Sequence, residues 1–136
     1  MQPLSDDPAL REVESALITS PVVSRFQTTE PERAVEHMER IYGPHALQLL
    51  GRDGIDMRVR GFELAHLHVA EIRYGSSAVA SMSQAHPHWV FSYLRRGTVR
   101  LGRNGEVVTA GTAGVNRPDA VVDLVMSADM ELVNLR

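Results

Sequence analysis

The sequence predicts a single mainly β domain, a sandwich or small barrel, with one or two helices near its N-terminal end. From Leu47 onward, short apolar runs alternate with turn residues, which is typical of many short strands. Asn104-Gly105 lies between two of these runs and predicts a tight hairpin, because both residues tolerate positive φ. The 136 residues suffice for one domain with its own core, and no repeat, linker or low-complexity tract divides them.

Two segments carry helix signals. In residues 5–17, Ser5 can cap a helix, Pro8 fits its first turn, and a narrow apolar stripe follows at helical spacing. The second segment begins at Thr29-Glu-Pro-Glu32, which has capping-box spacing, and ends at Gly43-Pro44, because proline cannot continue a helix. The apolar face expected for this second helix comprises Ala34, Val35, Met38, Ile41 and Tyr42.

The polar side of the second helix carries further expectations. Glu36 and Arg40 are four residues apart, so we expect them to form an ion pair. His37 falls on the same side, and we expect it to be solvated.

The expected strands occupy the rest of the chain. They are Leu47–Leu50, Ile55–Val59, Phe62–Tyr74, Ala78–Met82, Trp89–Arg95, Thr98–Leu101, Glu106–Thr109, Ala113–Asn116, Ala120–Met126 and Met130–Leu135. Turn residues separate them, and Arg60-Gly61 is one such expected turn. The last strand stops without a turn, cap or polar tail, which we interpret as a cut at a domain edge.

Composition excludes several classes of protein. There is no cysteine, so disulfides, thiolate zinc sites and cysteine nucleophiles are excluded. The apolar runs are too short to span a membrane and the N-terminus lacks the order of a secretory signal, so we expect a cytoplasmic protein. The net charge of −3 argues against nucleic-acid binding by this chain alone, because DNA-binding domains need a basic face.

The histidines are the only residues with metal-ligand spacing. His66 and His68 form one H-x-H pair and His86 and His88 form another, and residues i and i+2 of a strand share a face. If the two strands were neighbours, four imidazoles could bind zinc, copper, nickel or ferrous iron. The alternative is that these histidines lie on a half-exposed face or form hydrogen bonds in a polar pocket.

His86-Pro87-His88 begins an apolar strand that ends at Gly97, and this stretch resembles the first half of the metal site of cupin barrels. That pattern continues with a glutamate four or five residues later and a third histidine in a second segment. Here the glutamate position is apolar or aromatic, and the second segment, Thr109–Asn116, has no histidine. A catalytic metal needs about three protein ligands, so we expect neither a metal nor a cofactor. His66 and His68 are the only available replacements.

A pocket for a small ligand is better supported than an enzyme. The sequence has no G-x-S-x-G elbow, no phosphate-binding loop and no paired carboxylates. Around Trp89–Leu94, three aromatic residues share one strand face, which is more often core than a ligand contact. Buried Trp and Tyr side chains still need partners for their polar ends, and a small barrel can hold one ligand inside. The candidate ligand contacts are therefore His66, His68, His86, His88, Trp89 and Tyr93.

A group of segments in a specific order carries a resemblance to a known family. These segments are Phe26-Gln-Thr-Thr-Glu30, Ala34 to His45, Phe62-Glu-Leu64, Glu71-Ile-Arg-Tyr-Gly75, Tyr93-Leu-Arg-Arg-Gly97, Asn104-Gly105-Glu-Val-Val108, Gly111-Thr-Ala-Gly114 and Arg117-Pro118. Together they resemble the N-terminal effector domain of AraC/XylS-type transcription regulators. The resemblance covers residues 22–136 and leaves residues 1–21 as an N-terminal segment outside it.

The resemblance implies a cupin-like jelly-roll barrel that senses a small organic effector and controls a separate C-terminal domain with two helix-turn-helix units. This chain carries no such units, so contact with DNA would be made only through that other domain. A homodimer stays open, because the linker helices that often provide the dimer contact would begin where the chain stops. The alternatives are a stand-alone metal-dependent cupin enzyme that uses His86 and His88 with His66 and His68, and a structural dimerisation module with a filled barrel.

Overall fold

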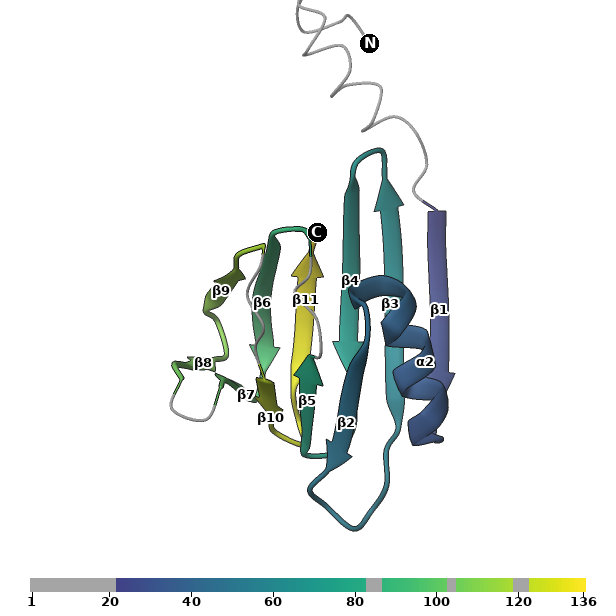
Figure 1. Cartoon of the computed structure of the whole chain (residues 1–136), viewed down its shortest axis with the longest axis vertical. Coiled ribbons are helices and arrows are strands. Elements are labelled where there is room, and N and C mark those ends of the chain that lie inside the picture. The colour runs from purple at the N-terminus through teal and green to yellow at the C-terminus, as the bar shows by residue number, and fades with distance from the viewer. Residues whose placement is uncertain (1–21, 83–86, 103–104, 119–122) are drawn as a thin grey trace, which may run out of the picture.

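The computed structural model of this chain describes residues 22–82, 87–102, 105–118 and 123–136. Their strands form two antiparallel sheets that face each other, and one helix, α2 (Pro31–Tyr42), lies beside the smaller sheet (Figure 1). The predicted mainly β class is therefore confirmed. The strand pairings of the described residues form two separate sheets and do not include closure into a barrel. One helix occurs in this part of the chain, and the helix expected over residues 5–17 lies outside it.

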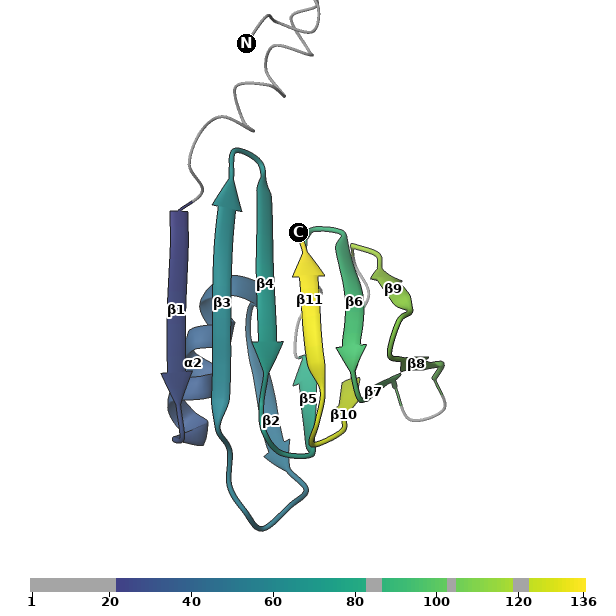
Figure 2. The same cartoon turned by 180° about the vertical axis from the view of Figure 1, so that it is seen from behind.

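The larger sheet has six strands in the order β1-β3-β4-β11-β6-β9. Their bounds are β1 (Val22–Thr28), β3 (Met57–Leu64), β4 (Leu67–Arg73), β11 (Glu131–Leu135), β6 (Val90–Arg96) and β9 (Ala113–Asn116). Figure 2 shows this sheet from its outer side, where no described helix or strand covers it. Alternate residues of each strand therefore point to the core and to the outer face.

The smaller sheet has five strands in the order β2-β5-β10-β7-β8. Their bounds are β2 (His45–Leu49), β5 (Ala78–Met82), β10 (Asp123–Met126), β7 (Thr98–Leu101) and β8 (Val107–Thr109). β7 and β8 pair as the antiparallel hairpin that the sequence predicts, whereas Asn104 of its turn lies outside the described residues. Gly97 joins β6 of one sheet to β7 of the other with φ of +75°, and a Cβ there would meet Ser127 and Met130.

Three strand predictions were wrong in detail. β1 was not predicted, because its residues are mostly exposed and alternate weakly, yet it pairs along its full length with β3. The expected strand Phe62–Tyr74 is two strands, β3 and β4, joined by a turn in which Ala65 adopts φ of +43°. The expected turn at Arg60-Gly61 is the middle of β3, where Gly61 lies against Ser24 of β1. A Cβ at Gly61 would overlap the Ser24 hydroxyl, so glycine serves close strand packing here.

The second predicted helix is confirmed as α2, with a corrected N-terminus. Pro31 is its first residue and Glu30 is the N-cap, whose side chain makes no capping hydrogen bond. The expected capping box from Thr29 is therefore absent, since proline favours the first helical position and fixes the start there. Thr28 Oγ1 instead accepts a hydrogen bond from the Glu30 amide at 3.0 Å.

The other features of α2 agree with the sequence except at His37. Ala34 and Met38 are buried against the sheets, and Arg40 pairs with Glu36 at 3.1 Å, as predicted. His37 was expected to be solvated, but its ring stacks on Phe26 of β1 with the centroids 3.9 Å apart. The expectation failed because β1, which was not predicted, provides a neighbouring surface. Burial, and secondarily the charge of Arg40, lowers the pKa of His37.

The core lies between the two sheets. Its largest fully buried side chains are Met57, Leu94 and Met130, which come from β3, from β6 and from the turn before β11. The rest of the buried cluster comprises Ala34, Met38, Ile55, Val59, Ala70, Ile72, Tyr74, Ala78, Ala80, Val99, Met126 and Leu132. None of the described helices has the length and apolar character needed to cross a membrane.

Candidate functional site

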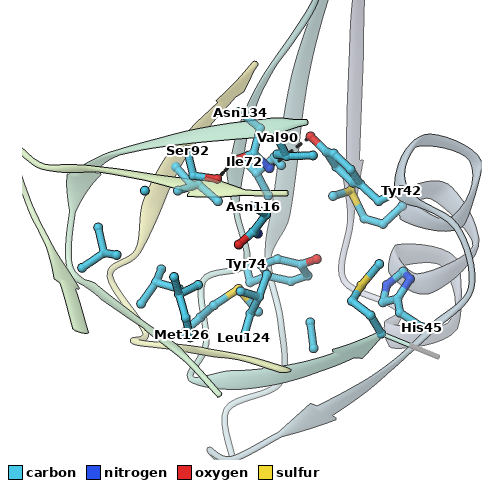
Figure 3. Close-up of a pocket in the computed structure, with 18 of the residues that line it drawn as sticks. Tyr42, His45, Ile72, Tyr74, Val90, Ser92, Asn116, Leu124, Met126 and Asn134 are labelled. Atoms are coloured by element: carbon cyan, nitrogen blue, oxygen red, sulfur yellow. Dashed lines mark hydrogen bonds between the residues drawn. The ribbon is translucent and has the colours of Figure 1, made fainter. Parts of the chain in front are cut away.

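A cavity of about 110 Å³ lies between the two sheets, next to α2 (Figure 3). Strands from both sheets build it, because their inward residues face one another across the gap. Its apolar walls comprise Met38, Ile72, Ala80, Met82, Val90, Val99, Leu101, Val108, Leu124, Met126 and Leu132. A mostly apolar cavity with a few polar groups is the usual form of a small-molecule site.

Three side chains form a hydrogen-bonded polar group in the wall of the cavity. Ser92 Oγ donates to Asn134 Oδ1 at 2.7 Å, and Asn134 Nδ2 donates to the Tyr42 hydroxyl at 3.1 Å (Figure 3). Ser92 and Asn134 are direct register partners on β6 and β11, whereas Tyr42 is the last residue of α2. These hydrogen bonds connect the C-terminal end of α2 to β11, which lies between β4 and β6 in the larger sheet. Burial raises the pKa of Tyr42 to about 12, so its phenol is neutral at physiological pH.

Two further polar side chains face the cavity without a hydrogen bond to another described residue. Tyr74 follows β4 and is 5% exposed, yet its hydroxyl has no hydrogen-bond partner among the residues that the structure describes. Burial, followed by the neighbouring Tyr42, raises the pKa of Tyr74 well above its ordinary value. Asn116 of β9 projects into the space beside Tyr74 (Figure 3). A hydroxyl and an amide are thus available to a molecule in the cavity.

Histidine and arginine provide the remaining polar groups. His45 Nδ1 lies 3.1 Å from the Gly43 carbonyl oxygen, and this nitrogen is the donor because a carbonyl oxygen only accepts. In the neutral ring, Nε2 of His45 is then a hydrogen-bond acceptor. His88 and Arg117 also line the cavity but are exposed, so they lie at its solvent-facing end. No described Asp or Glu lines the cavity.

The sequence-predicted contacts do not all gather in this cavity. His88 lines it, but Trp89 and Tyr93 do not, because their side chains point to the outer face of the larger sheet and are 50% and 46% exposed. The two predicted faces of β6 are therefore confirmed, but the aromatic face is neither core nor cavity wall. The inward face belongs to Val90, Ser92 and Leu94. His86 lies outside the described residues.

His66 and His68 lie in a second depression, of about 260 Å³, that His88 and Glu63 also line. The sequence-based hypothesis required the two histidine-bearing strands to be neighbours, and this condition is not met, because β11 lies between β4 and β6. His88 nevertheless lines the same depression as His66 and His68. However, no three His, Asp or Glu residues of the described segments are placed to hold a metal ion. His68 Nδ1 is buried without a hydrogen-bond partner. Burial, and then the charge of Arg136, lowers the pKa of His68.

The sequence analysis missed most of the polar residues of the cavity. These are Tyr42, His45, Tyr74, Ser92, Asn116, Arg117 and Asn134. For Asn134 a signal existed, since an amide at an inward position between Leu132 and Arg136 of an alternating strand must find a buried partner. The others carry no local mark that distinguishes them from ordinary core or turn residues.

Comparison with known proteins identifies the family. Residues 34–136 match the AraC-binding-like domain family. A search of curated proteins gave no significant match. Among solved structures, the AraC-like transcriptional activator CuxR is similar to this chain, with a TM-score of 0.63 and 19% sequence identity. That similarity covers 82% of this chain and 46% of CuxR, so this chain spans about half the length of that activator.

Two further solved structures show weaker similarity. An RmlC-like cupin from Shewanella frigidimarina matches with a TM-score of 0.48 and 21% identity, over 66% of this chain and 80% of that one. KdgF from Halomonas sp. matches with a TM-score of 0.43 and 20% identity, over 66% of this chain and 83% of that one. The family match over residues 34–136 spans most of the chain, and the fold of an AraC-like activator agrees with it. The chain therefore belongs to the AraC-binding-like domain family.

Proposed function

We propose that this domain senses a small organic effector in the cavity between its sheets and thereby controls a separate C-terminal helix-turn-helix domain. The observation that carries the proposal is the Tyr74 hydroxyl, which belongs to a buried side chain, faces a mostly apolar cavity and makes no hydrogen bond to another described residue. Among the described residues this hydroxyl is not a fully buried unpaired atom, so it is reachable from the cavity and can donate a hydrogen bond to a ligand oxygen or nitrogen. Family membership supports the regulatory role.

The size of the cavity restricts the effector. An apolar cavity of about 150 Å³ is known to accept benzene, so about 110 Å³ suits a molecule of roughly benzene size or smaller. Tyr74 offers a donor, His45 an acceptor and Asn116 both, while the walls favour a compact apolar body. The effector in this proposal is therefore a small molecule with one or two polar groups.

Signalling would follow from the position of α2. Tyr42, at the end of this helix, is bonded to Asn134 in the middle of the larger sheet, so a ligand beside them can favour one placement of the helix. An effector can shift such an equilibrium only by its difference in affinity for the two placements. In this proposal, DNA is bound by the other domain, in keeping with the net charge of −3 of this chain.

A thermal-shift screen of small polar organic molecules tests the proposal. A ligand at 100 times its Kd should stabilise the domain by about 2.7 kcal/mol. Tyr74→Phe should weaken binding of that ligand, whereas Tyr93→Phe, the same change on the outer face, should not. If no compound stabilises the domain, or if both variants bind equally well, the sensing role through this cavity is refuted.

The metal-dependent enzyme stays an alternative hypothesis, and elemental analysis discriminates it. A stoichiometric transition metal that is lost in the His86→Ala, His88→Ala double variant would replace the sensing proposal. A reading frame that continues past Arg136 into two helix-turn-helix units would support the regulator.

A further inference from the structure

Five arginines gather at one end of the outer face of the larger sheet. We call them the arginine cradle: Arg25 of β1, Arg58 and Arg60 of β3, Arg73 of β4 and Arg95 of β6. They line a shallow depression of about 560 Å³ on the side of the sheet seen in Figure 2. Among the described residues, Glu71 and Glu131 are the only acidic ones that line it, so the lining has a formal charge of +3, or +2 when Asp56, which pairs with Arg58, is included; the whole chain has −3.

The strand register places these arginines in direct opposition. Arg25 is the cross-strand partner of Arg60, and Arg58 is the cross-strand partner of Arg73. Like charges directly opposite each other destabilise a sheet. Two such pairs lie two residues apart along β3, a distance of about 7 Å. The fold thus places four positively charged side chains next to one another, at outward strand positions that uncharged polar residues could equally well occupy.

The described carboxylates balance only part of this charge. Glu71 contacts Arg60 at 2.9 Å and Arg95 at 3.1 Å, and these hydrogen bonds and charges lower the pKa of its carboxyl. Asp56 contacts Arg58 at 3.2 Å. The side chains of Arg25 and Arg73 form no hydrogen bond or ion pair within the described part of the chain. Arg25 therefore has no direct anionic partner there, and the charge of Arg73 acts on Asp56, a carboxylate that already pairs with Arg58.

We propose that the arginine cradle binds a ligand that carries a diphosphate group. Guanidinium groups bind phosphate oxygens through two parallel N–H donors, and each opposed pair offers more donors than one carboxylate can accept. The short separation of the two pairs suits two linked phosphates better than two independent anions. Glu71 is a positioning residue, because it holds Arg60 and Arg95 from one side and leaves their other N–H groups exposed.

This site is separate from the effector cavity. The arginines are at outward positions of their strands, whereas the cavity is lined by inward side chains such as Met38 and Tyr74 that do not line the cradle. Ile72 and Leu132 line both, because they belong to the sheet that separates the two. Occupancy of the cradle can therefore be measured without any effector. Failure of one proposal leaves the other standing.

Calorimetric titration of the chain with inorganic diphosphate at low ionic strength tests the inference. Wild-type protein should bind, and the Arg58→Ser, Arg73→Ser double variant should bind at least tenfold more weakly. The matched control is Arg52→Ser, Arg100→Ser, which removes the same charge at exposed positions outside the cradle. Absence of binding by the wild type, or equal loss in both double variants, would overturn the proposal.

A stability measurement provides an independent test, because the difference in melting temperature between variant and wild type should reverse when diphosphate is added. Without diphosphate, Arg25→Thr should raise the melting temperature, because it removes the like-charge pair that Arg25 forms with Arg60. With saturating diphosphate, the wild type should be the more stable protein. If the order of the two proteins does not reverse, the cradle is not a diphosphate site.

Titration with a nucleoside diphosphate identifies the source of the diphosphate group. Tighter binding than that of free diphosphate indicates a nucleotide, and weaker binding indicates the inorganic anion.

Discussion

Two buried tyrosines in one cavity allow the same atom to be removed in two different environments. Tyr42→Phe removes a hydroxyl that accepts a hydrogen bond from Asn134 Nδ2 at 3.1 Å. Tyr74→Phe removes a hydroxyl with no hydrogen bond to a described residue. Both substitutions leave the ring and its packing in place, so the comparison isolates the interactions of each hydroxyl, and the cycle with Asn134 below isolates the hydrogen bond to that residue.

The expected effects differ in sign. Tyr42→Phe leaves the buried Asn134 amide short of an acceptor and should lower the free energy of unfolding by about 1–3 kcal/mol. Tyr74→Phe removes a hydroxyl that makes no hydrogen bond to a described residue, so the free energy of unfolding should stay within about 0.5 kcal/mol of the wild type or rise.

Urea unfolding followed by circular dichroism provides the measurement, with equal m-values as the check that only stability has changed. A double-mutant cycle with Asn134→Ala should show a coupling energy of about 1 kcal/mol with Tyr42→Phe and none with Tyr74→Phe. Equal losses in the two Tyr→Phe variants would refute the reasoning, because the Tyr74 hydroxyl would then have a stabilising partner.

Three further outcomes are expected. Burial raises the pKa of Tyr42 to about 12, whereas its pKa in the unfolded state is about 10. Because the unfolded chain then loses this proton first, the free energy of unfolding should fall by up to about 2.7 kcal/mol as pH rises from 10 to 12. Urea titrations at several pH values should show a smaller fall in Tyr42→Phe. Leu94→Ala, at a fully buried position, should cost about 2–5 kcal/mol, whereas Phe91→Ala, 47% exposed on the same strand, should change thermal stability far less. The lowered pKa of His37 favours its neutral form in the folded state, so the melting temperature should fall as pH drops below about 6.5. His37→Phe keeps a ring stacked on Phe26 but cannot be protonated, so this variant should show a smaller fall.

The parts of this fold that local sequence determines could be predicted. α2 carries its own signals, a proline in the first turn, an apolar stripe and Gly43 at the C-cap with φ of +87°, and it forms close to the expected bounds. The two faces of β6 follow from alternation alone. The turn between β3 and β4 was missed because Ala65 carries no turn signature, and β1 was missed because an edge strand is specified by its partner, here β3.

The candidate site required the tertiary structure. Alternation shows that Trp89 and Tyr93 share a face of the strand. It does not show whether that face or the opposite face, which carries Ser92, points into the core. The polar group of the cavity joins Tyr42 to Asn134, residues 92 positions apart in the chain. The arginine cradle likewise depends on register, which opposes Arg25 to Arg60 and Arg58 to Arg73.

The sequence by itself thus determined the fold class, the main helix, most strands and the resemblance to a regulator domain, because these depend on local pattern and order along the chain. The identity of the cavity and cradle residues was decided only when distant strands paired and one face of each turned inward. That choice rests on non-local packing, in which whole sheets compete to bury their apolar faces, and no single segment encodes it.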